Sequence, residues 1–394
     1  MKTRLLFLLF LFLFSSWFAS AQDVITDAQF EIGLSNQFFF KEGAYEGQMS
    51  NYLSLSFSPE FSVEWQEGDQ GLYTAGFFRW FQHDNSRTHW DIRELYYQKV
   101  AGRSEFSAGL RKVFWGVTES AHLVDIINQT DALESFDGEN KLGQPMVKYS
   151  YSANFGTFDV YYMPYFRPRM YPGENGRLRT PVALDGDQFQ YESSAEQGHQ
   201  DFAIRYAHYL GVFDFGLSYF RGTGREPIVT SIEQFNPVWG IIDQVGLELQ
   251  ATTGPALWKF EGIVRKNALQ DMEALVTGVE YTFGNINNSG IDVGVIGEYL
   301  WDSRGDMALS SMQNDLFVGT RFAFNDIQDT QILAGGIFDL ERSTRLLSIE
   351  ASRRVKNSWR VELEARLFQN VSNNEFLYVI RQDSFAQFSI IKFF

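Results

Sequence analysis

The sequence predicts an all-β protein: a transmembrane antiparallel up-and-down β-barrel of about 18 strands, with 16 strands as the alternative count. From residue 29 onward, segments of about ten residues alternate between apolar and polar side chains. Aromatic residues make up 16% of the chain and include 38 Phe, yet the mean hydropathy is −0.22. A barrel reconciles these values, because every second side chain contacts lipid while the others line a wet lumen.

The clearest strand covers residues 359–367. Its odd-numbered positions, from Trp359 to Leu367, are apolar or small, whereas its even-numbered positions are all charged. Neither lipid nor a soluble core accepts such a charged face, so it is expected to line water. The alternative for most wall charges is pairing across strands without a role in solute passage. The lumen candidates on this and other strands are Arg205, Glu248, Lys259, Glu261, Arg265, Glu280, Glu298, Arg321, Glu350, Arg360, Glu362, Glu364 and Arg366.

Short and long connections alternate along the chain, as they do in bacterial barrels with periplasmic termini. Pro59 interrupts the segment 48–66, which is interpreted as one strand with a bulge or bend, because splitting it would give an odd strand number. The short turns are expected at 67–70, 101–103, 154–155, 210–211, 252–254, 284–289, 325–328 and 355–356. The longer loops are expected at 41–47, 83–88, 115–144, 165–198, 222–241, 266–272, 302–313, 341–344 and 369–383.

The two ends of this strand series are expected to pair with each other. An open sheet edge cannot lie in lipid, because its backbone groups would lack hydrogen-bond partners. Residues 384–394 should therefore pair with residues 29–39. The chain ends on Phe394 after Phe388 and Ile390 on the same face, which resembles the terminal sorting signal of outer-membrane barrels. The expected partner of Phe394 is the barrel-assembly machinery.

Residues 1–21 are expected to be a signal peptide. Lys2 and Arg4 precede an apolar run over residues 5–14, and Ala19-Ser20-Ala21 matches a cleavage site. The apolar run is too short to span a bilayer as a helix; a retained amphipathic anchor is the alternative. Residues 22–394 are then a single barrel domain in the outer membrane of a Gram-negative bacterium.

Composition excludes several classes of function. The chain has no cysteine, which removes disulfides, thiolate metal sites and cysteine catalysis. A formal charge of −16 argues against nucleic acid as a partner. The five histidines are scattered, and neither G-x-S-x-G nor H-E-x-x-H occurs. We expect no catalytic residue, no metal and no cofactor.

The segment 115–144 is the first candidate for a selectivity element. Residues 120–133 could form a short helix with Leu123, Ile126 and Ile127 on one side. Folded into the barrel, this third outer loop would narrow the lumen and place its carboxylates beside wall arginines, creating a transverse field. An ordinary solvated loop is the alternative. Its acidic residues, opposed within the loop by Lys141 alone, are Glu119, Asp125, Asp131, Glu134, Asp137 and Glu139.

The second candidate is the segment 165–181, where arginines concentrate in an otherwise acidic chain. The planar guanidinium suits carboxylate or phosphate ligands. The segment could form an anionic-solute site near the mouth or the partner of the acidic loop; alternatively, its arginines bind lipopolysaccharide or loop carboxylates. The four residues are Arg167, Arg169, Arg177 and Arg179.

Three segments carry a family resemblance: 115–131, 166–179 and 242–265. The first contains Trp115-Gly116 followed by Ile127-Asn128-Gln129-Thr130-Asp131. In these segments the chain resembles poorly characterised porin-like outer-membrane proteins, although it lacks the proline of the corresponding stretch. The resemblance implies a porin-type barrel and no particular substrate.

The sequence thus favours an outer-membrane channel for passive diffusion of small polar or charged solutes, narrowed by the loop 115–144. The predicted lumen is too charged to suit a hydrophobic solute. A closed structural or surface-recognition barrel, binding a partner or polysaccharide through its outer loops, is the alternative. The expected partners are outer-membrane lipid, lipopolysaccharide, small solutes and further copies of the chain in a homotrimer.

Overall fold

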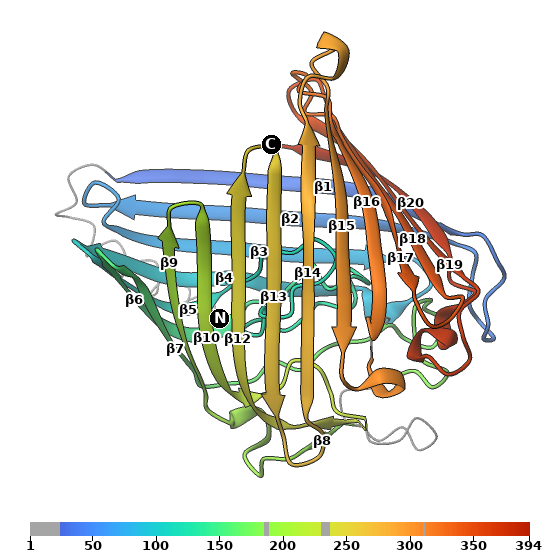
Figure 1. Ribbon diagram of the computed structural model, residues 1–394, viewed down its shortest axis with the longest axis horizontal. Coiled ribbons are helices and arrows are strands. Elements are labelled where there is room, and N and C mark those ends of the chain that lie inside the picture. Colours follow the sequence, from blue (N-terminus) through green and yellow to red (C-terminus); the bar gives the residue numbers. More distant parts are fainter. Residues whose placement is uncertain (1–23, 185–188, 230–236, 310–311) are drawn as a thin grey trace, which may run out of the picture.

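The computed structural model describes residues 24–184, 189–229, 237–309 and 312–394. Eighteen antiparallel strands form one closed sheet (Figure 1), as predicted. The expected signal peptide lies outside the described residues. Among the described residues, no helix is long and apolar enough to cross a membrane.

The barrel strands follow one another around the ring in chain order. The first nine are β1 (Ile25–Phe39), β2 (Asn51–Trp65), β3 (Gln70–Phe81), β4 (His89–Ala101), β5 (Ser104–Arg111), β6 (Gln144–Ala153), β7 (Gly156–Met163), β9 (Asp201–Leu210) and β10 (Phe213–Thr223). The other nine are β12 (Ile241–Thr253), β13 (Ala256–Lys266), β14 (Met272–Phe283), β15 (Asp292–Asp302), β16 (Asn314–Ala323), β17 (Gln331–Asp339), β18 (Arg345–Val355), β19 (Trp359–Gln369) and β20 (Phe385–Phe393).

The connections carry a few short elements of their own. Two two-residue strands, β8 (Gln190–Tyr191) and β11 (Val238–Trp239), pair in parallel outside the barrel sheet. The 3-10 helices are η2 (Asn85–Arg87), η4 (Glu196–Gly198), η5 (Ile286–Asn288), η6 (Gly305–Met307) and η7 (Phe376–Ile380).

The barrel closes where β1 meets β20, as predicted. Their register runs from Glu31 opposite Phe393 to Phe39 opposite Phe385. The backbone N–H of Phe394 donates to Phe30 O at 3.0 Å, and the two rings stack with centroids 4.8 Å apart. Both strands therefore have hydrogen-bonded neighbours on both sides, and the sheet has no open edge.

Pro59 lies within a single strand, as predicted. β2 keeps its pairing with β1 through this position, where Pro59 faces Phe30. On the β3 side the pairing stops at Phe57 and resumes at Glu60 in the same register, because proline has no N–H to donate. The bulge lies one strand further away, where the β3–β4 register shifts between Ala75 and Gly76.

The outer face of the barrel is apolar. On β12, Val245 and Leu247 are 48% and 41% exposed, whereas Gln244 and Glu248 on the other face are 1% and 6% exposed. The same alternation holds on β16, where Leu316 and Val318 point outward and Asp315 and Phe317 are buried. Such a band of exposed aliphatic and aromatic side chains is the surface that lipid covers.

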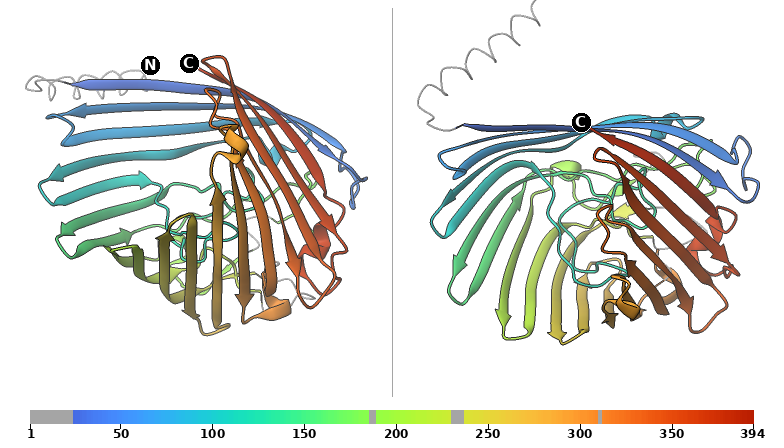
Figure 2. Two further views of the ribbon diagram at one scale, coloured as in Figure 1. Left: turned by 45° about the horizontal axis from the view of Figure 1, so that its top comes forward. Right: turned by 90° about the horizontal axis from the view of Figure 1, so that it is seen from above.

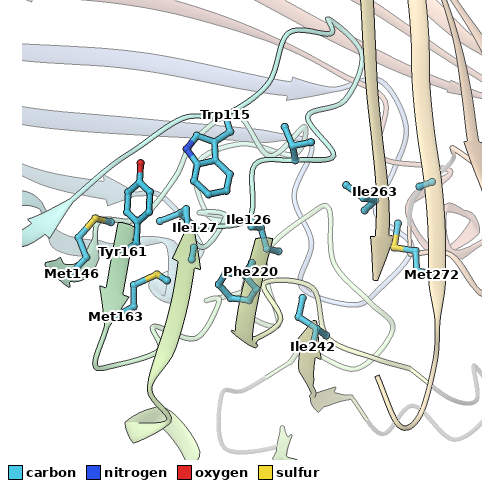
Figure 3. Packing of buried hydrophobic residues seen from close by; sticks show 13 residues of the cluster. Trp115, Ile126, Ile127, Met146, Tyr161, Met163, Phe220, Ile242, Ile263 and Met272 are labelled. Carbon is cyan, nitrogen blue, oxygen red and sulfur yellow. The ribbon is translucent and has the colours of Figure 1, made fainter. Parts of the chain in front are cut away.

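The connection from β5 to β6 lies inside the barrel (Figure 2). Its residues Trp115, Val124, Ile126 and Ile127 are buried against lumen-facing side chains of the wall. Figure 3 shows this cluster, whose wall members are Met146, Tyr161, Met163, Ala203, Phe220, Ile242, Ile263, Met272 and Ala274. The predicted inward folding of 115–144 is confirmed. The predicted helix over 120–133 is wrong, since the segment contains only turns, bends and an isolated bridge between Thr130 and Lys141.

Candidate functional site: the lumen and its inner loop

The inner loop, residues 112–143, is held by two wall carboxylates. Glu261 on β13 is fully buried and accepts from the backbone N–H of Val117 at 2.7 Å, of Thr118 at 3.0 Å and of Val124 at 3.2 Å. It also accepts from the hydroxyl of Thr118 at 2.7 Å. This one carboxylate thus satisfies backbone donors that an irregular loop would otherwise leave unpaired.

Glu298 on β15 repeats this arrangement two strands away. It accepts from the backbone N–H groups of Glu119 and Ser120, both at 2.8 Å, and from the Ser120 hydroxyl at 2.5 Å. Two residues predicted as lumen charges are therefore anchors of the loop backbone.

The acidic residues of the inner loop all have basic partners. In all six pairs the charged atoms lie at most 3.2 Å apart, five with Lys or Arg and one with His122. This close pairing reduces the transverse field that separated rows of charge would create. The pairs are Glu119–Arg321 (2.6 Å), Asp125–Lys141 (3.2 Å), Asp131–Arg93 (2.5 Å), Glu134–Arg79 (2.7 Å), Asp137–Arg366 (2.6 Å) and Glu139–His122 (3.2 Å).

The ion-pair and anchoring partners of the loop lie on three parts of the ring. Arg79 and Arg93 lie on β3 and β4, a second set extends from β13 to β16, and Arg366 lies on β19. Around the ring, β17 and β18 separate Arg366 from the second set, and β20, β1 and β2 separate it from β3. The loop therefore crosses the lumen instead of following one wall.

Burial and pairing set the charge states within the loop. Burial alone would lower the pKa of His122, but the carboxylates of Glu139, at 3.2 Å, and Glu261, at 3.8 Å, raise that pKa to about 10. Burial would raise the pKa of Glu134, but Arg79 holds it below its usual range. For Asp125, burial outweighs Lys141 and raises the pKa. At neutral pH, His122 is thus a cation between two carboxylates.

The remaining wall charges also pair within the lumen. Arg205 contacts Glu248 directly, and Lys259 and Arg321 share Glu280, each at 3.4 Å. Many of the charged wall residues are thus paired across strands, which was the alternative to a role in solute passage. That they also contact a passing solute stays a prediction. The other contacts are Lys259–Glu119 (3.7 Å), Arg265–Glu226 (3.6 Å), Arg360–Glu362 (2.7 Å), Arg366–Glu350 (2.6 Å) and Arg366–Glu364 (3.2 Å).

The four arginines of 165–181 differ in their surroundings. Arg167 pairs with Asp91 at 2.6 Å, and the buried Arg177 pairs with Asp383 at 2.7 Å. Arg179 donates to the carbonyl oxygens of residues 174, 180 and 181. Arg169 donates to Gln129 Oε1 and to the carbonyl oxygen of residue 225, and forms no ion pair among the described residues. Of the four, only Arg169 contacts no carboxylate and a single backbone carbonyl oxygen among the described residues. A contact between a solute and any of these arginines stays a prediction.

Two cavities lie on either side of the loop segment 114–122. The inner cavity, of about 670 Å³, is lined by Phe114 to Val117 and by residues near the short turns, including Asn154 and Asp214. The outer cavity, of about 570 Å³, is lined by Thr118, Glu119, Ser120 and His122 and by residues of the long loops. The loop thus separates the space toward the short turns from the space toward the long loops.

One wall of the outer cavity is apolar, which the sequence analysis did not anticipate. Phe317, Ile337, Leu346 and Phe368 are successive cross-strand partners on β16 to β19. They lie on the lumen side, because Phe317 is also the partner of the inward-facing Glu298. The lumen candidates named from the sequence were all charged, and this apolar row was not among them. The sequence contains these apolar residues at the alternating positions that face the lumen. They were missed because other lumen-facing positions on the same strands are charged.

The described residues contain no group of three or more His, Asp or Glu side chains that could hold a metal ion.

No protein-family model and no curated protein sequence matches the chain. Among solved structures, it is similar to two porins of Pseudomonas aeruginosa. OccD3 (OpdP) is 11% identical with a TM-score of 0.56, over 95% of this chain and 93% of that one. OpdQ is 10% identical with a TM-score of 0.53, over 94% and 97%. Wzi of Escherichia coli, described as an outer-membrane carbohydrate-binding β-barrel involved in group 1 capsule assembly, is 12% identical with a TM-score of 0.53, over 93% and 84%. The chain therefore has the fold of an outer-membrane, porin-like β-barrel.

Proposed function

We propose that this protein is an outer-membrane channel for passive diffusion of small polar or charged solutes, narrowed by the inner loop. The observation that carries the proposal is the inner loop itself, which crosses the lumen from charged residues on β3 and β4 to charged residues on β13 to β16 and leaves a cavity on each side. Rings of charged side chains and inward-folded segments are how channels set selectivity. The fold shared with two porins supports the same function.

The proposal assigns transport and no catalysis. Among the described residues, the hydrogen-bond and ion-pair partners of His89, His122 and His199 are a carbonyl oxygen and carboxylates, and none of these histidines bonds a serine or threonine hydroxyl. A nucleophile activated by a neighbouring base would need such a contact.

The expected partners follow from the surfaces. Lipid and lipopolysaccharide would cover the apolar outer face, small solutes would enter the lumen, and the barrel-assembly machinery would bind the strand that ends at Phe394. A homotrimer is a separate prediction, which the mass of the detergent-solubilised barrel tests.

The second candidate is a closed barrel that binds carbohydrate through its outer loops. The observation that favours it is the packing of the long loops over one another: Arg177 donates to the carbonyl oxygens of Lys41, Met49 and Gln382, which belong to two other connections. Wzi, described as carbohydrate-binding, shares the fold.

Planar-bilayer conductance of the refolded barrel separates the two candidates. A channel should give steady openings whose size or ion selectivity changes when Asp131→Asn and Glu134→Gln release the loop from β3 and β4. Glu105→Gln, a wall carboxylate paired with Arg111 at 3.0 Å and Lys148 at 3.4 Å, neither of them in the inner loop, is the matched control. A folded barrel without openings would exclude the diffusion channel and favour the closed, carbohydrate-binding barrel.

A further inference from the structure

The outer cavity combines an apolar wall with a cationic side, and the apolar wall is only partly covered. The row of Phe317, Ile337, Leu346 and Phe368 continues toward Leu333, which is the cross-strand partner of Arg321. Phe317 and Phe368 are buried, but Leu333, Ile337 and Leu346 are only half-buried and line the cavity. Exposed aliphatic side chains inside a wet lumen are unfavourable unless an apolar group covers them.

Arg87 provides the cationic side. It lies on η2, between β3 and β4, is 8% exposed, and lines the outer cavity. Its Nη1 donates to Gln37 Oε1 at 3.3 Å, and its guanidinium carbon lies 3.9 Å from the centroid of the Phe81 ring. Its Nε is buried without a hydrogen-bond partner, and it forms no ion pair among the residues that the structure describes.

A buried guanidinium without a carboxylate is unusual, because desolvation of the charge costs several kcal/mol unless a counter-charge offsets it. Burial also lowers the pKa of Arg87 to about 10. The other arginines at this cavity show the contrast: Arg177 has Asp383, and Arg366 has three carboxylates. Glu134, Asp84 and Asp131 act on Arg87 only from beyond ion-pair distance, and an incoming anion would supply a direct contact.

We propose that the outer cavity binds an amphipathic organic anion, whose oxyanion contacts Arg87 and whose apolar body lies on the β16–β19 row. This inference rests on the proposed channel and names its solute class. Arg169 and Arg179 also line this cavity and form no ion pair among the described residues, but Arg179 donates to three carbonyl oxygens. Arg169 also lines a neighbouring cavity of about 240 Å³, and we assign it the next contact of the same anion.

One feature of the cavity opposes an anion. Asp137, Glu350 and Glu364 share the single guanidinium of Arg366, so this corner carries excess negative charge. It would attract a cation instead. The test therefore compares an anion and a cation that have the same apolar body.

The test uses isothermal titration calorimetry of the refolded full-length barrel with phenylacetate, phenethylammonium and acetate. Phenylacetate should bind at least about tenfold more tightly than either other probe, a difference of about 1.4 kcal/mol. Arg87→Gln, which keeps a hydrogen-bond donor but removes the charge, should weaken phenylacetate about tenfold. Arg103→Gln, which removes the same charge from an exposed turn beside β5, should leave binding unchanged.

A second variant protects the test against misfolding of the first. Ile337→Ala retains every charge and should weaken phenylacetate while leaving acetate unchanged. Tighter binding of phenethylammonium than of phenylacetate, or unchanged phenylacetate binding in both variants, would overturn the proposal. Conductance of the same preparations distinguishes the two proposals: openings without phenylacetate binding reject the anion site alone, and binding without openings rejects the channel alone.

Discussion

Glu261 accepts hydrogen bonds from both the backbone N–H and the hydroxyl of Thr118, at 3.0 and 2.7 Å, and thereby joins β13 to a loop that starts after β5. Glu261 is fully buried and also binds Val117 and Val124. Together with Glu298, this wall side chain thus fixes the depth at which the inner loop crosses the lumen.

Replacing this carboxylate should release the loop. In Glu261→Ala, the loop N–H groups lose an acceptor, and each lost hydrogen bond to a charged group costs about 1.5–3 kcal/mol. We expect larger and noisier single-channel openings and faster proteolysis within residues 115–124. Glu362→Ala, which removes a wall carboxylate whose one ion pair within the described part of the chain is with Arg360, is the control. Identical openings in the two variants would contradict an anchoring role for Glu261.

The charge on His122 predicts a dependence on alkaline pH. The pKa of His122 is raised from 6.5 to about 10 by Glu139 and Glu261, although burial opposes this. A raised folded-state pKa means that the pairing stabilises the loop fully below pH 6.5, and that this stabilisation is lost as the pH rises through about 10.

Channel noise should therefore stay constant through neutral pH and increase near pH 10. In His122→Gln it should be high at every pH and independent of pH. Conductance recorded from pH 6 to 11 measures this, with His208→Gln, whose ring stacks on Tyr206 and meets Phe215 edge-on, as the control. An alkaline transition that persists in His122→Gln would assign the effect to another group.

Much of the barrel could be predicted from the sequence, because its rule is local. Lipid on one side and water on the other impose a period of two on every strand, and the even-numbered charges from Arg360 to Arg366 show that period directly. Closure of β1 on β20 follows from the need to pair every backbone group. The same need explains why Pro59 could be placed within one strand, since β2 loses its pairing there only on the side of β3.

The inner loop could be predicted only in outline. Its length, acidity and apolar residues indicated an inward position, but its conformation depends on Glu261 and Glu298, which lie more than a hundred residues further along the chain. Local periodicity suggested a helix, whereas the Val124 N–H, which a helix over 120–133 would bond to the carbonyl oxygen of Ser120, donates to Glu261 instead. That Arg87 forms no ion pair among the described residues could not be predicted from the sequence either, because only the folded chain shows which arginines lie next to a carboxylate.

Arg177 should stabilise the long-loop end of the barrel. It is 1% exposed, pairs with Asp383 at 2.7 Å, and donates to three carbonyl oxygens of two other connections. Arg177→Ala leaves Asp383 buried without its partner, which typically costs about 3–5 kcal/mol. We expect a lower unfolding midpoint in denaturant and faster cleavage of the long loops. Arg354→Ala, at an exposed position near a short turn, should change neither.

The terminal aromatic ring should matter for closure of the barrel. Phe394 stacks on Phe30 at 4.8 Å and its backbone N–H donates to Phe30 O, so it completes the last pair of strands. In Phe394→Ala the backbone bond remains but the ring contact is lost, at a cost of about 0.5–1.5 kcal/mol beyond the lost burial. We expect slower folding into lipid vesicles, measured by the shift in gel mobility between folded and unfolded barrel. Phe158→Ala removes an exposed ring from the middle of the sheet, on β7; if it slows folding as much as Phe394→Ala does, the effect reflects general loss of lipid-facing area and not the seam.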